Sequence, residues 1–281
     1  MLINREWTCL RFYLTAFLMV SHCALSNADE QSHADAAEQA TANAAPTSSV
    51  AGPSDAWHTS LTVYLWFPGT HGTLGNNGRT VDFRASAGDL FSNFRFGLMG
   101  AVQAQRGHFV VISDLVWVRL RATNTITLPF PGVPQLSAEA KAWQLMVTPE
   151  AGYRFLDREK VKIDALLGFR YWRVGASLQF TPSPLGLSFS GTRNWADPLM
   201  GARIQFPLSE RALVTVLGDA GGWGAGAQLD YQVVGIIGFK VSRRITLGAG
   251  YRYLYVNYRP GSFVFDTTMS GPMVGLNYSF K

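Results

Sequence analysis

Apolar and polar positions alternate along most of the chain after residue 56. The clearest case is the segment 142–155. One face of this segment carries Trp143, Leu145, Val147, Pro149, Ala151, Tyr153 and Phe155, and the other carries Gln144, Thr148, Glu150, Gly152 and Arg154. Because successive side chains of a strand point to opposite sides, a period of two predicts strands with two different faces.

Segments of this kind recur down to the C-terminus, and connections that alternate between short and long separate them. We expect strands at roughly 57–67, 95–106, 108–120, 141–156, 161–174, 193–207, 211–221, 227–240, 244–258 and 268–280. Short turns at one end and long loops at the other are typical of an antiparallel up-and-down transmembrane β-barrel. The sequence therefore predicts an all-β barrel of about ten strands, with eight to twelve possible.

The first long connection, 68–93, contains a turn signal of its own. Asn77 and Gly78 lie between two short β-prone stretches, and Asn-Gly is typical of a tight hairpin. We interpret this connection as a hairpin above the membrane. If its arms spanned the membrane, the barrel would have twelve strands.

The polar face of these strands carries ten charged residues in mid-strand. They are Asp114, Glu150, Arg154, Asp164, Arg170, Asp197, Arg203, Asp219, Asp230 and Arg252. A soluble sandwich would also alternate, but it would bury these charges in its core at a high desolvation cost. A barrel with its apolar face toward lipid and its polar face toward a lumen accommodates them.

Aromatic residues make up 13% of the chain, and many of those on the apolar face lie near the ends of the expected strands. They include Trp57, Phe67, Phe96, Phe109, Trp117, Trp143, Phe155, Tyr171, Phe206, Tyr231, Phe239, Tyr255, Tyr278 and Phe280. Aromatic girdles at both membrane interfaces are typical of outer-membrane barrels.

The N-terminus predicts export. A basic start and an apolar run from Phe12 to Val20, followed by small residues, predict a signal peptide at 1–28. Residues 29–56 are rich in Ala, Ser, Thr and Pro and predict a disordered periplasmic lead-in. The barrel domain then covers 57–281. An even number of strands places both termini in the periplasm, in a protein of the cell outer membrane.

Cleavage after residue 28 changes the composition only slightly. Lys plus Arg falls from 24 to 22 and Asp plus Glu from 19 to 18, which leaves a charge of +4. The mature chain loses both cysteines, and its basic residues form no cluster of the kind that nucleic acid requires. We expect no nucleic-acid partner, no metal and no cofactor.

The end of the chain carries a family resemblance. Val274, Leu276, Tyr278 and Phe280 share one face and resemble the C-terminal signature that outer-membrane barrels present to the barrel-assembly machinery, although Lys281 follows the usually terminal Phe. Together with Gly250 to Tyr253 and similar stretches, this segment is similar to the broad OmpA/OmpW-like superfamily of small outer-membrane barrels. The resemblance implies contact with outer-membrane lipid and lipopolysaccharide, with Tyr278 and Phe280 as the assembly signal.

The sequence leaves several functions open. The inward charges either plug the lumen with ion pairs or line a constriction that selects small solutes. An enzyme acting on lipid A or peptides is an alternative, but only His58 and Ser60 have suggestive spacing, and they lie at the periplasmic end of the first strand. A surface receptor or adhesin is a further alternative, which rests on the long loops. No substrate and no oligomeric state follow from the sequence.

Overall fold

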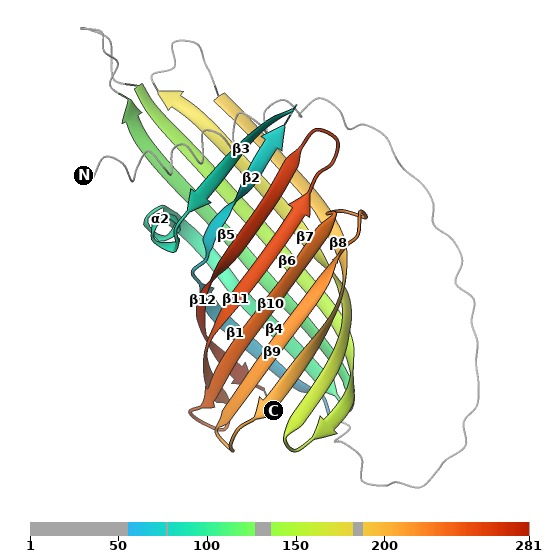
Figure 1. Cartoon of the computed structure of the whole chain (residues 1–281). Helices are drawn as coiled ribbons and strands as arrows, with labels where there is room; N and C mark the ends of the chain where they lie inside the picture. The colour runs from blue at the N-terminus through green and yellow to red at the C-terminus, as the bar shows by residue number, and fades with distance from the viewer. Residues whose placement is uncertain (1–55, 77, 127–135, 182–187, 281) are drawn as a thin grey trace.

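A computed structural model describes residues 56–76, 78–126, 136–181 and 188–280 (Figure 1). The expected signal peptide and nearly all of the expected lead-in lie outside the described residues. The strands are β1 His58–Trp66, β2 Gly69–Asn76, β3 Arg79–Ala85, β4 Phe94–Arg106, β5 Phe109–Ile126, β6 Leu136–Arg158, β7 Val161–Thr181, β8 Ser188–Pro207, β9 Ala212–Gly222, β10 Leu229–Lys240, β11 Ile245–Tyr258 and β12 Val264–Ser279.

The sheet closes on itself. β1 pairs with β4 on one side and with β12 on the other, from Ser60 opposite Ser279 to Trp66 opposite Met273. The ring of β1 and β4 to β12 therefore has ten strands, and each pairs in antiparallel register with the strands on either side of it in the ring. Where β1 pairs with β4 and β12, closure satisfies the backbone groups of both edges, as a strand structure in lipid requires. The predicted fold class is confirmed.

The strands reach further than the sequence analysis expected at the long-loop end. Residues 122–140 and 181–192, which lie between the expected strands, belong in part to β5, β6, β7 and β8, and β6 alone has 23 residues. A membrane-spanning strand needs about 9 to 11 residues. The strands remain paired beyond the end of the apolar face, because backbone hydrogen bonds between strands form whether the side chains face lipid or water.

The expected hairpin in 68–93 is present, with Gly78 at a positive φ of 77° in its turn. Its first arm, β2, pairs with β12 from Gly69 opposite Ser270 to Gly75 opposite Val264. The hairpin thus extends the sheet above β1 (Figure 1). A six-residue helix, α2 (Ala87–Ser92), which begins with a capping box on Ser86, then leads to β4.

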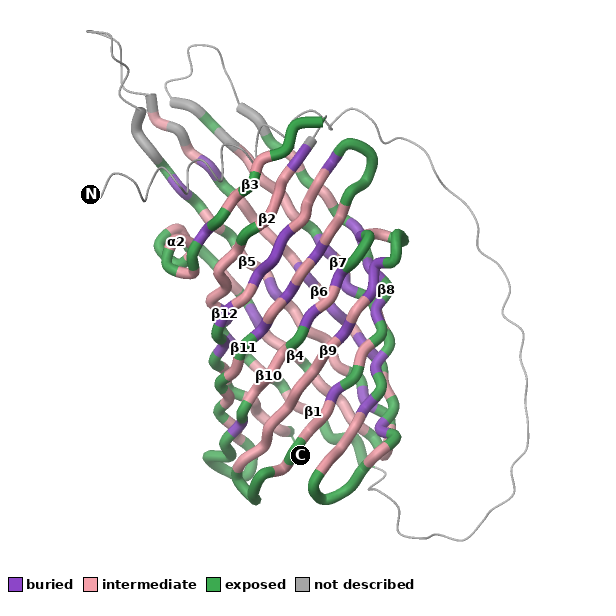
Figure 2. The backbone as a smooth tube through the Cα atoms, in the orientation of Figure 1, coloured by how far each residue is buried: buried purple, intermediate pink, exposed green. Residues whose placement is uncertain are grey.

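Buried and exposed residues alternate along the strands (Figure 2). The outward positions carry many exposed apolar side chains, among them Leu61, Val102, Phe155, Leu167 and Phe239. A closed barrel with an apolar exterior is the arrangement of a barrel immersed in lipid. Among the described residues, no helix is long and apolar enough to cross a membrane.

Candidate functional site

The interior of the barrel contains the charged residues that the sequence analysis singled out. Nine of the ten are buried, and the side chain of the tenth, Asp114, is 19% exposed. Eight of them form three groups, which differ in the strands that supply them, and Glu150 and Asp197 belong to none of the three.

The first group, the turn-end cluster, lies beside the short turn between β6 and β7. Arg154 donates from Nε to Oδ1 of Asp164 at 2.8 Å, and Arg203 donates from Nε to Oδ2 of the same carboxylate at 2.8 Å. The two guanidinium groups also donate to Gln205 and Gln103. One carboxylate therefore joins β6, β7 and β8, and the glutamine of β4 connects them across the lumen.

The second group, the central cluster, is built around Arg170, whose side chain is completely buried. Its guanidinium donates to Asp219 at 2.8 Å and to Asp230, and its Nε donates to the hydroxyl of Thr148 at 3.1 Å. The indole of Trp172 donates to the other oxygen of Asp230 at 2.7 Å. A cation held by two carboxylates and a hydroxyl has most of its donors satisfied, as burial of a charge requires.

The third group, the Arg252 cluster, lies against β1, β5 and β11. Arg252 donates from Nη1 to Oδ2 of Asp114 at 3.0 Å and to the hydroxyl of Tyr64 at 3.1 Å. Tyr64 in turn donates to Oδ1 of Asp114 at 2.6 Å. The guanidinium also lies 5.0 Å above the ring of Trp66.

Two of the six acids have no ion pair among the described residues. Asp197 accepts a hydrogen bond from the indole of Trp195 at 2.9 Å and another from the backbone of Ala227. Glu150 is only 4% exposed, and its Oε1 has no hydrogen-bond partner in the described part of the chain. Asp114, Asp164, Asp219 and Asp230 thus pair with inward arginines, whereas Glu150 and Asp197 do not.

The sequence analysis missed the uncharged members of these clusters. Tyr64, Gln103, Thr148, Gln205 and Gln232 all bond to the charged groups. Each lies on the inward face of its strand by the same period of two. Strand parity could have found them, but a search for charges alone did not.

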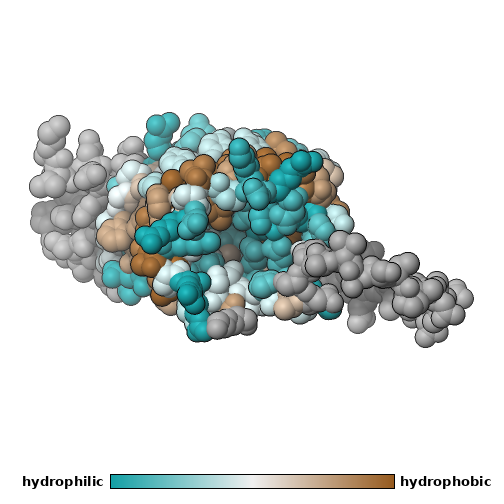
Figure 3. Space-filling model, turned by 90° about the horizontal axis from the view of Figure 1, so that it is seen from below, coloured by the Kyte–Doolittle hydropathy of each residue, from teal (hydrophilic) through white to brown (hydrophobic). Residues whose placement is uncertain are grey.

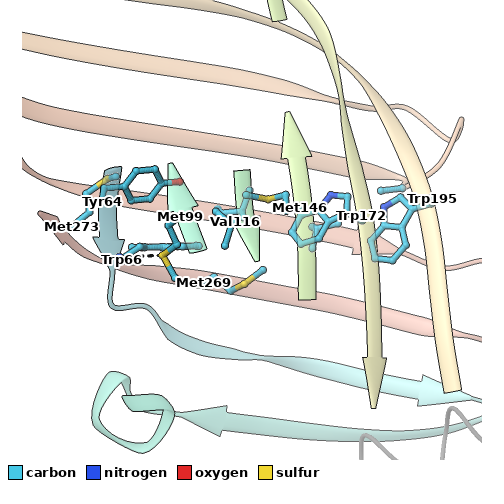
Figure 4. Packing of buried hydrophobic residues seen from close by; sticks show 12 residues of the cluster. Tyr64, Trp66, Met99, Val116, Met146, Trp172, Trp195, Met269 and Met273 are labelled. Atoms are coloured by element: carbon cyan, nitrogen blue, oxygen red, sulfur yellow. Dashed lines mark hydrogen bonds between the residues drawn. The ribbon is translucent and has the colours of Figure 1, made fainter. Parts of the chain in front are cut away.

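Next to the central and Arg252 clusters the lumen is lined by apolar side chains, which corrects the expectation of a polar interior. Buried side chains from eight of the ring strands meet there (Figure 4). They are Tyr64, Trp66, Met99, Val116, Met146, Trp172, Trp195, Leu254, Val256, Met269 and Met273, with Ala227 from the loop between β9 and β10. We call this set the apolar layer. Unbranched methionine side chains fill irregular gaps between the rings.

Stacked rings complete the apolar layer on one side. The ring of Trp195 stacks on Trp172 at 5.6 Å and on Tyr258 at 4.0 Å between centroids, and Phe265 meets both tryptophans at a steep angle. Large rings in contact leave little space for water. The lumen therefore holds three charged clusters and an apolar layer that packs against two of them.

The opposite, short-turn end of the barrel is more polar. Viewed from this end, hydrophilic side chains gather at the centre and hydrophobic ones lie beside them (Figure 3). Tyr278 and Phe280 lie at this end of β12 with their rings 5.0 Å apart, and Phe280 is 47% exposed. Phe67, expected in an aromatic girdle, is instead half-buried with its ring 6.2 Å from Phe91 of α2.

The described residues offer no metal site, since no three of their His, Cys, Asp or Glu side chains are grouped to hold an ion. His58, at the start of β1, and His108, in a short turn, lie at one end, and His71 lies on the hairpin at the other. His58 and Ser60 share the inward face of β1 at the short-turn end.

The comparisons with known proteins extend only to the fold. No family model and no curated protein matches the chain. Among solved structures, the outer membrane protease OmpT from Escherichia coli aligns with a TM-score of 0.56 at 11% identity, over 82% of this chain and 99% of its own. The translocator domain of the autotransporter NalP from Neisseria meningitidis aligns with a TM-score of 0.38 at 15% identity, over 80% of this chain and 88% of its own. The likeness to OmpT shows a shared barrel fold.

Proposed function

We propose that the protein is an integral outer-membrane barrel whose lumen is closed, and that it serves the envelope as a structural barrel rather than as an open pore. The observation that carries the proposal is that the four mid-strand arginines Arg154, Arg170, Arg203 and Arg252 all form ion pairs inside the lumen. Arg170 and Arg252 pair with acids on strands that are not their neighbours in the ring. A constriction that selects ions presents its charges to passing solute, whereas these charges are bound to one another.

The apolar layer supports the same proposal. Ions need a hydrated path, and Trp66, Met146 and Trp172 are each 4% exposed or less in the middle of the lumen. A barrel of about eight strands is just wide enough for side chains to fill. Ten strands with large rings and long arginines fit that regime better than a water-filled channel.

The exterior supports the location. Exposed apolar side chains surround the barrel, as contact with outer-membrane lipid and lipopolysaccharide requires. On this proposal, residues 1–28 are a signal peptide, 29–56 a periplasmic lead-in and 57–281 the barrel. The short turns and both termini face the periplasm, where the assembly machinery recognises Tyr278 and Phe280.

Swelling of proteoliposomes in sugars of increasing size tests the proposal. We expect liposomes with the refolded protein to swell no faster than protein-free liposomes, because no sugar passes the apolar layer. A double variant, Trp172→Ala with Trp195→Ala, removes two rings of the layer and is the positive control. Swelling of wild-type liposomes in the smallest sugars would instead support the narrow-pore alternative.

A further inference from the structure

The wall of the barrel is incomplete at one place on the long-loop side. β1 pairs with β4 only from His58 opposite Gln105 to Val63 opposite Gly100. Above that point β1 leaves the sheet at Trp66, and β2 takes its place beside β12. The upper part of β4, from Phe94 to Met99, pairs with β5 on one side, and no described strand pairs with its other side. β3 and β4 thus border an unpaired seam.

The backbone N–H of Trp66, just above the last paired residues of β1 and β4, marks the start of the seam. The N–H of Trp66 donates to the thioether sulfur of Met99 at 3.3 Å, where a continuing ladder would offer a backbone carbonyl (Figure 4). Sulfur is a weak acceptor. β1 and β4 have therefore separated at this level, and a side chain fills the space between them.

A cavity of about 330 Å³ runs from this seam into the lumen. Its outer lining includes Leu65, which is 51% exposed on the outer face of β1, and Phe91 of α2, which is 67% exposed. Its inner lining includes Met99 and Val116, which belong to the apolar layer. The same cavity therefore touches both the lipid-facing surface and the interior, and the apolar layer forms its floor. Its volume lies at the lower end of the range for small-ligand sites, about 300 to 1,000 Å³.

The few polar groups of the cavity define the chemistry of an occupant. The indole nitrogen of Trp66 and the hydroxyl of Thr267 are buried and have no hydrogen-bond partner among the described residues, and both residues line the cavity. An unsatisfied buried donor is costly, so these two groups favour a ligand that brings an acceptor.

Arg193 adds charge at the far wall. It lines the cavity from β8, which lies five strands from β1 in either direction around the ring, and it is half-buried. Its guanidinium lies 5.4 Å above the ring of Phe263, and no acid among the described residues forms an ion pair with it. An anionic head at Arg193 and an apolar tail at the seam would match both ends of the cavity.

We propose that this cavity binds a single-chain amphiphile with a carboxylate head, a fatty acid, which enters sideways from the lipid through the seam between β3 and β4. The alkyl chain lies among the apolar side chains of the seam, and the carboxylate accepts hydrogen bonds from Arg193 at the far wall. This inference does not depend on whether the lumen conducts, because binding and permeation are measured separately.

Quenching of tryptophan fluorescence by dibromostearate tests the proposal with the full-length mature protein folded in amphipol. We expect saturable quenching that unlabelled stearate reverses, because Trp66 lines the cavity. The methyl ester of dibromostearate has the same tail without the charge, and we expect it to bind about tenfold more weakly or worse, as loss of a charge-assisted hydrogen bond predicts.

Two pairs of variants test separately where the alkyl chain binds and where the carboxylate binds. Val118→Phe fills the cavity and should weaken binding several-fold, whereas Val102→Phe, on the outer face and away from the cavity, should leave it unchanged. Arg193→Gln should weaken binding of the acid about tenfold and leave the ester unaffected. Arg119→Gln removes another arginine that lies above an aromatic ring, but outside the cavity, and should change nothing.

Each outcome bears on the proposal. Quenching that does not saturate, or that is equal in Val118→Phe and the wild type, would overturn the site. Equal affinity for acid and ester would overturn the carboxylate head. Heat-modified migration on a gel checks that each variant is folded, and if Arg193→Gln does not fold, the comparison of acid and ester on the wild type still decides the question of the head.

Discussion

Arg252 and Asp114 form an ion pair of 3.0 Å between β11 and β5, which lie four strands apart in the ring and 138 residues apart in sequence. Such a contact cannot be made along the wall of the barrel. It crosses the interior and joins an early strand to a late one. The two side chains meet only when the barrel is closed.

Replacing Arg252 with Ala should destabilise the barrel by about 3 kcal/mol, because removal of one partner of a buried pair leaves the other charge uncompensated. Asp114 would keep only the hydroxyl of Tyr64. Urea unfolding followed by tryptophan fluorescence measures the change. Arg119→Ala, which removes an exposed arginine, serves as the control and should cost less than about 0.5 kcal/mol. Equal effects of the two substitutions would contradict a structural role for the pair.

Replacing Glu150 with Gln should stabilise the folded barrel, whereas replacing Arg252 with Ala destabilises it. Glu150 is buried without an ion pair, so its charge costs desolvation energy that no direct ion pair offsets. We expect the amide to stabilise the folded barrel by about 1 kcal/mol at neutral pH. Asp219→Asn is the matched comparison, since it removes a carboxylate that does bind Arg170, and it should destabilise. The same unfolding experiment distinguishes them, and a loss of stability in Glu150→Gln would count against the account of this group.

Two strand glycines should differ sharply in their tolerance of a methyl group. A Cβ at Gly221 of β9 would lie 1.8 Å from the carbonyl oxygen of Pro198, whereas at Gly235 of β10 it would meet nothing within 4 Å. Gly221→Ala should therefore push β8 and β9 apart and cost about 2 kcal/mol or more, and Gly235→Ala should be nearly neutral. Samples heated to increasing temperatures and run on a detergent gel show the temperature at which the folded barrel changes to the migration of the unfolded chain, and this temperature measures the difference. The prediction is wrong if both variants behave alike.

Phe280→Ala should impair assembly in cells while leaving refolding into detergent intact. The side chain of Phe280 is 47% exposed at the end of β12 and its ring meets that of Tyr278 edge-on, so its removal costs little packing. Leu208→Ala removes another exposed apolar residue at the same end of the barrel and serves as the control. Folded protein in outer-membrane fractions, compared with the yield of refolding in vitro, separates recognition from stability. Equal losses in both assays would assign Phe280 a packing role instead.

Much of this architecture can be predicted from the sequence, because strand parity is local. The alternation in 142–155 predicts both the strand and the inward placement of Glu150 and Arg154. The pairing of these charges is less predictable. Arg154 bonds to Asp164 and shares it with Arg203 because register and side-chain length bring three strands together, and no spacing in the sequence encodes that.

The apolar layer was missed for a different reason. Met146 and Trp172 lie on the polar face of their strands. On a single strand such an apolar residue seems to be an isolated exception, and only the comparison of several strands shows that their inward apolar residues form a layer. The seam is also invisible in the sequence. The turn at Gly78 predicts a hairpin, yet only the pairing of β2 with β12 shows that the hairpin replaces β1 in the wall. Contacts between strands distant in the sequence determine both features.

Single-channel recording in planar bilayers tests the closed lumen most directly. The account predicts that the refolded wild-type protein gives no steady unitary current, because ion pairs and the apolar layer cross the whole interior. The double variant Trp172→Ala with Trp195→Ala should conduct. Steady currents through the wild type that rise further in Arg203→Ala or Arg252→Ala would contradict the account and show that these arginines line a pore.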